Sequence, residues 1–246
     1  MDILQELPLE QWPVLQEKLK ELWPLNLPGY YFLYTNIKHP IIREAFHFKV
    51  YCPYGDMNNG FIGMNVKRPH NQEIILFSLT EDTSVIQEAI IKTKIIDWSG
   101  QLSFDPITST ALKVLENIKE AVGFTKFIVN RPKMFILERH TKPFTDLRLP
   151  KDTYVAPLKQ ENIPRINETW PHRYPESPYF FSTLISAGVS YGLYSISHEL
   201  LAWVLFNEGH YLCHLYCEES HRRKGYAQYI LKYVVNEELE LGNDVY

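Results

Sequence analysis

The stretch LLAWVLFNEGHYLCHLYCEESHRRKGYAQYILKYVVNEE occupies residues 200–238 and decides the fold of the second half of the chain. Two apolar segments, residues 200–206 and 210–217, favour strands, and the intervening Asn-Glu-Gly sequence predicts a hairpin turn. A short basic turn follows. The residues after this turn place apolar side chains on one face of a predicted helix. The region therefore reads as strand, basic turn and helix.

The basic turn has the sequence Arg222-Arg223-Lys224-Gly225-Tyr226-Ala227. The start of a helix presents amide N–H groups and the positive end of the helix dipole, so a phosphate placed there is stabilised. Gly225 and the small Ala227 let a diphosphate approach the backbone closely. The glycine patterns of a Walker A loop and of a dinucleotide-binding turn are both missing from the sequence. The turn thus predicts a pyrophosphate site.

Arginine at 222, glycine at 225 and alanine at 227 match the pyrophosphate motif of the GNAT acyltransferases, which this region resembles. Residues 214–217 and 221–227, together with Trp-Pro-His-Arg at 170–173, resemble the glycine N-acyltransferase-like (FR47-type) branch. The resemblance covers residues 151–246 with specific motifs. Over residues 1–140 it rests on the order of helix, strands and helices, and it implies a GNAT-like half without a phosphate turn.

The resemblance implies an N-acyltransferase that uses acetyl-CoA or another acyl-CoA as co-substrate and needs no metal. A small amine or amino acid such as glycine would accept the acyl group. The residues expected to hold the cofactor are Leu215, Tyr216, Cys217, Arg222, Arg223, Lys224, Gly225, Tyr226 and Ala227. The strand residues among them would pair their backbone with the pantetheine arm. Trp170 and His172 are the expected substrate-pocket residues.

Acyl transfer to an amine needs an acceptor for the amine proton. Family members with a carboxylate base on this strand place a glutamate eleven residues before the first motif residue, where this chain has Tyr211. Tyrosine, with a pKa of about 10, is a poor base at neutral pH. Glu208, His210 and His214 are close in sequence, and His214 has the most suitable intrinsic pKa. Tyr211 and His214 are the candidate catalytic residues.

The first half of the chain shows no residues that signal chemistry. Apolar spacing predicts a helix at 9–22. Strand-favouring residues predict a meander; its strands are expected at 30–35, 46–52, 61–66 and 73–79. Further elements are expected as helices at 84–92 and 109–122 and as short strands at 126–129 and 134–138. This half is expected to be a self-contained α+β unit.

Residues 141–152 contain two prolines and several charges and predict a linker between domains at 1–140 and 153–246. Helices at 161–170 and 178–186 and a strand at 191–196 are expected before the hairpin. The expected fold class is α+β, with two GNAT-like halves, each a mostly antiparallel mixed sheet flanked by helices. GNAT proteins continue past the motif helix, so the second half is expected to be shortened. Either the first half completes its sheet, or the cofactor slot is open on one side.

Composition limits the class of protein. The chain has 246 residues, 45% of them hydrophobic and 22% charged, which is typical of soluble globular proteins. A net charge of -4 gives no overall basic field and disfavours nucleic acid as a partner. No apolar run is long enough for a membrane span. The sequence sets no oligomeric state.

The cysteines and the start of the chain bear on the compartment. The three cysteines form no CxxC pair, and Cys213 and Cys217 are expected on one face of a strand, which favours reduced thiols in an intracellular protein. The acidic start, Met-Asp-Ile-Leu-Gln-Glu, lacks the features of a secretory signal or a mitochondrial presequence. The cytoplasm is the expected compartment, and the mitochondrion stays open.

Three hypotheses of function follow from the sequence. The first is an N-acyltransferase. The second is a binding module that holds acyl-CoA without turnover, because Tyr211 stands at the position of the base. The third is a structural protein whose basic turn binds nothing. Titration with coenzyme A separates the third hypothesis from the other two, and a thiol-release assay separates the first from the second.

Overall fold

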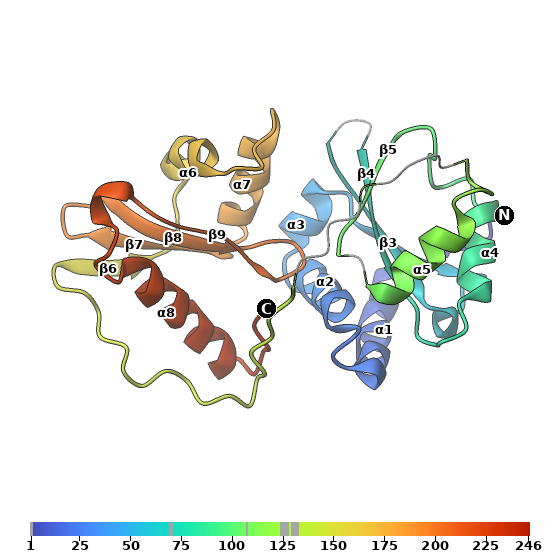
Figure 1. The fold of residues 1–246 in the computed structure, drawn as a ribbon, viewed down its shortest axis with the longest axis horizontal. Coiled ribbons are helices and arrows are strands. Elements are labelled where there is room, and N and C mark those ends of the chain that lie inside the picture. Colours follow the sequence, from blue (N-terminus) through green and yellow to red (C-terminus); the bar gives the residue numbers. More distant parts are fainter. Residues whose placement is uncertain (1, 69–70, 107, 124–127, 129–132) are drawn as a thin grey trace. The chain divides into compact units, whose positions relative to one another are not determined.

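The structure is a computed structural model that describes residues 2–68, 71–106, 108–123, 128 and 133–246. The chain forms two compact units, residues 1–131 and 132–246 (Figure 1). The α+β fold class expected from the sequence is confirmed. The first unit contains a mixed five-stranded sheet and the second an antiparallel four-stranded sheet, and helices flank both sheets.

The first unit contains five strands and five α-helices in the described residues. In chain order they are β1 (Leu4–Glu6), α1 (Trp12–Lys18), α2 (Leu27–Lys38), α3 (Pro40–Ala45), β2 (Lys49–Pro53), β3 (Phe61–Arg68), β4 (Asn71–Phe77), α4 (Ser84–Lys92), β5 (Gln101–Phe104) and α5 (Ser109–Ile118). Short 3-10 turns at Leu9–Gln11, Leu19–Leu22 and Met57–Asn59 complete the unit.

The sheet of the first unit separates two layers of helices. Strands β1 to β4 pair antiparallel in chain order, and β5 adds to β4 in parallel. Apolar side chains of α4 and α5 pack with Ile62 and Ile74 on one face of the sheet, while α1 and α2 pack with Phe61 and Ile75 on the other. The predicted meander at 46–79 and the helix at 84–92 are therefore confirmed. Strands β1 and β5 and helix α3 lie outside the elements predicted from the sequence.

The strand predicted at residues 30–35 is wrong, because this segment forms the middle of α2. The preceding Pro28 lies in the first turn of the helix, where a proline needs no amide hydrogen. Phe32 and Leu33 are then buried in the core formed with α1 and the sheet. Burial on one side of a helix thus outweighs the strand preference of consecutive aromatic residues.

The second unit places four strands between helices on two faces (Figure 1). Its elements are β6 (Thr153–Ala156), η4 (Gln160–Asn162), α6 (Ile163–Thr169), α7 (Ser177–Ser186), β7 (Ser190–Ser195), β8 (Leu200–Phe206), β9 (Leu212–Cys217), η5 (Glu219–His221) and α8 (Tyr226–Glu240). All neighbouring strands pair antiparallel in the order β6-β7-β8-β9. The predicted hairpin and the helix after the basic turn are confirmed.

Strand β8 is apolar on both faces because helices cover both sides of the sheet. Trp203 lies near His214, whose ring contacts Phe181 of α7, so this face of β8 points toward α6 and α7. Phe206 stacks on His210, which bonds to Glu238 of α8, so the alternate residues of β8 point toward α8. The central strand therefore fixes the positions of the helices on both faces.

A β-bulge interrupts β9 at His214. Leu205 pairs with Cys213 and Trp203 with Tyr216, so β9 has one residue more than β8 between these pairs. His214 has a positive φ of 51°. Cys217 pairs with Ala202, and Ala202 and Leu205 lie on opposite faces of β8. The expectation that Cys213 and Cys217 share one face is therefore wrong, because the extra residue reverses the alternation.

Residues 133–152 contain no helix or strand and belong to the second unit. The strand predicted at 134–138 is reduced to an isolated bridge between Leu137 and Val245. The strand predicted at 126–129 lies outside the described residues, apart from residue 128. Further along, the backbone of Phe144 exchanges two hydrogen bonds with the side chain of Asn236 on α8. The predicted linker thus lies against this helix.

The two units repeat one order of elements. Each begins with a strand, continues with helices and three antiparallel strands, and then adds a helix after the last of these strands. The connection from β4 to α4 in the first unit therefore corresponds to the connection from β9 to α8 in the second. This correspondence allows the two helix starts to be compared directly.

Candidate functional site

The basic turn connects β9 to α8, in the order that the sequence predicts. Gly225 is the N-cap of α8, with φ 81° and ψ 4°, a left-handed conformation that favours glycine. Arg223 also has a positive φ, of 63°, whereas Lys224 between them does not. Such alternation turns successive amides toward one side of the backbone and is typical of anion-binding turns. A Cβ built on Gly225 would meet no atom within 4 Å, so the space beside the turn is open.

The starts of α8 and α4 differ in the charge that lies beside them. The N-cap residue forms no side-chain cap at either helix. At the corresponding helix of the first unit, the carboxylate of Asp82 accepts a hydrogen bond of 2.9 Å from the Ser84 amide. A carboxylate at a helix start occupies the position that an anionic ligand would take. The second unit is therefore better suited to bind a phosphate than the first.

The cations of the turn are exposed and loosely held. In the described part of the chain, Arg223 and Lys224 make no hydrogen bond or ion pair. Arg222 has weak partners: its Nε donates to the Cys217 carbonyl at 3.3 Å, and a terminal nitrogen lies 3.5 Å from Glu219. Its guanidinium also lies 5.5 Å from the centre of the Tyr216 ring. These cations are available to a phosphate at little cost.

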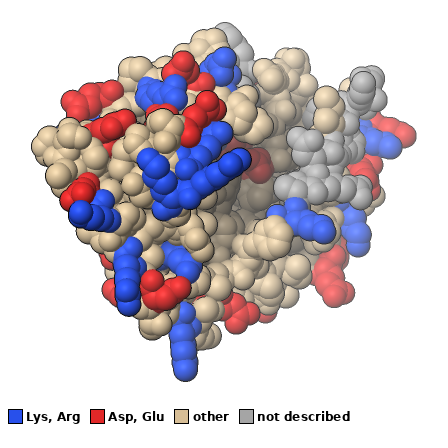
Figure 2. Space-filling view, turned by 60° about the vertical axis from the view of Figure 1, so that its left-hand side comes forward, with Lys and Arg blue, Asp and Glu red and all other residues tan. Residues whose placement is uncertain are grey.

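The surface charge on the face drawn in Figure 2 is mixed. Figure 2 shows acidic and basic side chains interspersed on the face that it presents, with one group of adjacent Lys and Arg side chains. The positive charge of the turn is thus a local feature of a chain whose net charge is -4.

Strand β9 is one of the two edge strands of the sheet formed by the described residues. The Glu218 amide donates to the Leu201 carbonyl at 2.9 Å, so the backbone groups of the preceding Cys217 point away from β8. Leu215 is 42% exposed on the same strand. At the other end of β9, the Leu212 amide donates to the Tyr246 carbonyl at 2.9 Å. The edge near Cys217 can therefore pair with an extended ligand.

The Cys217 thiol lies beneath the start of α8. Burial raises the pKa of this thiol, and the Arg222 charge and the Ala227 amide partly offset that effect. The thiol is a neutral group at neutral pH for this reason. It adds no negative charge near the phosphate site.

His214 lies on the face of the sheet that α6 and α7 cover. Its Nε2 is 2.8 Å from the Ile166 carbonyl oxygen, which requires a proton on Nε2 and leaves Nδ1 as the basic nitrogen. Phe181 and Trp203 pack against the ring, with centroids 5.6 and 5.9 Å away. Burial lowers the pKa of His214, and the bond to Ile166 partly counteracts this. The ring is thus a neutral imidazole at pH 7.

Trp170 and His214 belong to one aromatic cluster, which the sequence analysis did not foresee. The Trp170 ring stacks on Phe180 at 5.7 Å and lies 6.4 Å from His214. His172 is exposed and meets Trp170 edge-on at 6.2 Å. The two expected substrate-pocket residues are therefore adjacent. Of these two, Trp170 has a ring contact with His214, and no such contact is found for His172 among the described residues.

Tyr211 lies at the hairpin end of β9, away from the basic turn. Its amide donates to the side chain of Asn207, and its ring is 6.1 Å from that of Tyr246. His210 and Glu238 are buried beside this hairpin and bond at 3.0 Å. The candidate residues thus occupy three positions along β9: the hairpin, the bulge and the basic turn.

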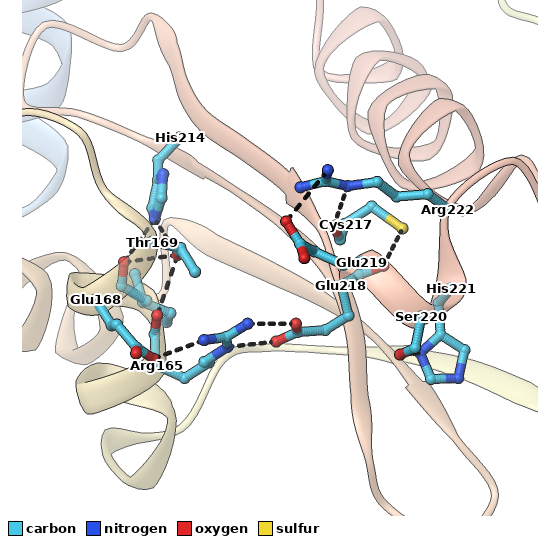
Figure 3. A network of polar contacts seen from close by, with 11 residues as sticks. Arg165, Glu168, Thr169, His214, Cys217, Glu218, Glu219, Ser220, His221 and Arg222 are labelled. Atoms are coloured by element: carbon cyan, nitrogen blue, oxygen red, sulfur yellow. Dashed lines mark hydrogen bonds and ion pairs between the residues drawn. The ribbon is translucent and has the colours of Figure 1, made fainter.

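An ion-pair network beside the turn was missed by the sequence analysis (Figure 3). Arg165 of α6 binds both carboxylate oxygens of Glu218, at 2.8 and 2.7 Å. Fifty-three positions separate these residues, so no local pattern indicates the pair. The network joins α6 to the segment that leads from β9 into the basic turn.

No family model and no curated protein matches the sequence. Among solved structures, the chain is similar to a Drosophila protein determined by X-ray crystallography as a target of the Northeast Structural Genomics Consortium. The TM-score is 0.76 at 17% sequence identity, and the alignment covers 100% of this chain and 89% of the other. At this identity the likeness shows a shared fold over both units and carries no activity from one protein to the other.

None of the helices in the described residues has the length and apolar character needed to cross a bilayer.

Proposed function

We propose that the second unit binds acyl-CoA and that the chain is an N-acyltransferase of the GNAT type, similar to glycine N-acyltransferases. The observation that carries the proposal is the open start of α8. A left-handed glycine, three cations and an uncapped helix end meet there, one short 3-10 turn beyond an edge strand. This combination suits a diphosphate that is attached to an extended arm.

In this proposal the turn from Arg222 to Ala227 holds the pyrophosphate. The pantetheine arm extends along the edge of β9 and pairs with the outward amide of Cys217, whose carbonyl accepts from Arg222. The thioester then lies near the bulge at His214. Because the bulge breaks the ladder with β8, backbone groups beside it can be directed toward the thioester oxygen.

The proposed chemistry is direct transfer from the thioester to a small amine or amino acid such as glycine. The amine nitrogen forms a bond to the carbonyl carbon, and the bond from that carbon to sulfur breaks, so that coenzyme A leaves as a thiolate. The proton lost by the amine needs an acceptor. Nδ1 of His214 is the candidate, since a neutral imidazole can accept a proton at pH 7.

A second candidate function is an acyl-CoA-binding module without turnover. The environment of His214 favours it, because one ring nitrogen is committed to Ile166 and aromatic rings surround the imidazole. Tyr211 lies at the hairpin, and a phenol is a poor base. Both candidate functions need the same cofactor site. They differ in that the binding module has no group to accept the proton of the amine.

A pair of measurements on the full chain separates these functions. Calorimetric titration with coenzyme A tests binding, and thiol release from acetyl-CoA and benzoyl-CoA, against glycine and a panel of amines, tests transfer. Binding with thiol release that depends on the amine supports the enzyme. Binding without any release supports the module. Titration without heat, together with an unchanged melting temperature, contradicts both.

A further inference from the structure

Arg165 and Glu218 form a bidentate ion pair beside the basic turn (Figure 3). The guanidinium reaches from α6, and its Nε and one terminal nitrogen bond to the two oxygens of Glu218 at 2.8 and 2.7 Å. The other terminal nitrogen bonds to Glu168 at 2.6 Å. The Glu218 side chain is 17% exposed, so water screens this pair less than an ordinary surface pair.

Glu218 lies close to the cations of the turn. It follows β9 directly. The hydrogen bond from its backbone amide to the Leu201 carbonyl continues the ladder between β9 and β8. Its side chain shares a face of the strand with Tyr216, on whose ring the Arg222 guanidinium lies. The hydrogen bonds from Arg165 lower the pKa of Glu218, burial partly opposes this, and the charges of Arg165, His221 and Arg222 lower it further. Glu218 is thus an ionised carboxylate within the field of Arg222.

The present partners of Arg222 are weaker than a bidentate carboxylate. Its bonds to the Cys217 carbonyl and to Glu219 measure 3.3 and 3.5 Å, and its side chain is 51% exposed. Arg222 lies only four residues after Glu218. Without Arg165, Glu218 would be a poorly solvated anion next to an exposed cation, and pairing with Arg222 would satisfy both.

We propose that Arg165 is a positioning residue for the phosphate site: by neutralising Glu218 it keeps Arg222 free to bind the pyrophosphate. This inference rests on the proposed acyl-CoA site. Arg165 itself touches no ligand in the proposal. Its effect on affinity passes entirely through Glu218 and Arg222.

The test is calorimetric titration of the full chain with coenzyme A. The variants are Arg165→Met, Glu218→Gln and the double variant, with Glu168→Gln as the matched control, because Glu168 is the other partner of Arg165. We expect Arg165→Met to weaken affinity about tenfold, the loss of one charge-assisted contact. Glu218→Gln, the double variant and the control should stay within about twofold of the wild type.

The restored affinity of the double variant is the distinguishing result. If the ion pair served only as a structural bridge, Glu218→Gln and the double variant would bind as weakly as Arg165→Met, and the inference would be wrong. Arg165→Lys, which keeps the charge, should retain most of the affinity. Combining Arg165→Met with Arg222→Met should cause no loss beyond that of Arg222→Met alone.

The outcomes also separate this inference from the proposed function. If wild-type protein binds coenzyme A and Arg165→Met binds equally well, the role of Arg165 is refuted and the acyl-CoA site stands. If the wild type gives no heat, the site fails and the inference fails with it. Should Arg165→Met not fold, as judged by circular dichroism, Glu218→Gln still decides, since weakened binding by that variant alone contradicts the role.

Discussion

At the scale of single residues, two backbone conformations shape the candidate site. Positive φ angles at Arg223 and Gly225 turn the chain into α8, and a positive φ at His214 accompanies the bulge in β9. Glycine accepts such an angle without strain, whereas histidine and arginine do so at a cost of about 1 kcal/mol. Both non-glycine residues therefore hold conformations that the surrounding structure imposes.

His214 should make the stability of the protein depend on pH. Its pKa in the folded state is lowered, whereas in the unfolded chain it is about 6.5. Below pH 6.5 the unfolded state therefore binds a proton that the folded state does not, and stability falls as the pH falls toward the folded pKa. Replacing His214 with Gln removes this contribution.

The measurement compares urea unfolding of wild type and His214→Gln at pH 7 and pH 5. We expect the wild type to lose more stability than the variant over this interval, because only the wild type has the imidazole with the lowered pKa. Equal losses would show that the folded protein protonates His214 as readily as the unfolded chain does. This result would contradict the conclusion that burial lowers the pKa of His214 in the folded protein.

At the scale of elements, the sequence predicted what local patterns encode. Strand β8, helix α4 and the turn into α8 follow from apolar runs, helical spacing and the glycine at 225. The segment at 30–35 was assigned to the wrong class because its aromatic residues favour strands until a helix buries them. Short strands such as β1 and β6 carry too few residues to show a period.

The candidate site was predictable only in part, for a related reason. The basic turn is contiguous in sequence, so its glycine and its three cations were enough to predict it. The bulge at His214, the pair of Arg165 with Glu218 and the packing of Trp170 near His214 depend on contacts between distant segments. The extra residue in β9 also places Cys217 on the face of the sheet opposite to Cys213. The alternation of residues in the sequence cannot reveal this.

The docking of residues 141–150 against α8 should depend on Asn236. This side chain exchanges hydrogen bonds of 2.8 and 2.9 Å with the Phe144 backbone. Asn236→Ala removes both, at about 1 kcal/mol each, and should therefore increase local opening. We expect trypsin to cleave after the exposed Arg148 up to about thirty times faster than in the wild type.

Gln228→Ala provides the control, since Gln228 is an exposed position of the same helix. Its cleavage rate should equal that of the wild type. Identical rates in all three proteins would mean that the Asn236 bonds do not hold the segment in place.

At the scale of the whole molecule, two units of similar element order carry one candidate phosphate site. The start of α4 is occupied by the Asp82 carboxylate, whereas the start of α8 is uncapped and basic. The chain should therefore bind one equivalent of coenzyme A, and the effects of the ligand should be confined to the second unit.

Hydrogen exchange on the full chain tests this asymmetry. Saturating coenzyme A should slow exchange of amides in β9 and in the first turn of α8, because these groups bond to the ligand in the proposed complex. Exchange in β3 and β4 of the first unit should stay unchanged. Slower exchange in the connection from β4 to α4 would instead place the ligand on the first unit and contradict the proposed site.

The central claim is that the turn at Gly225 binds the pyrophosphate of acyl-CoA, and titration of Gly225→Glu with coenzyme A tests it most directly. The added carboxylate fills the open space beside the turn and repels the phosphates. Gly188→Glu is the matched control, because Gly188 has a similar positive φ of 74° and no atom within 4 Å of a Cβ. We predict that wild type and Gly188→Glu bind coenzyme A alike and that folded Gly225→Glu gives no binding heat. Undiminished affinity of folded Gly225→Glu would contradict the site.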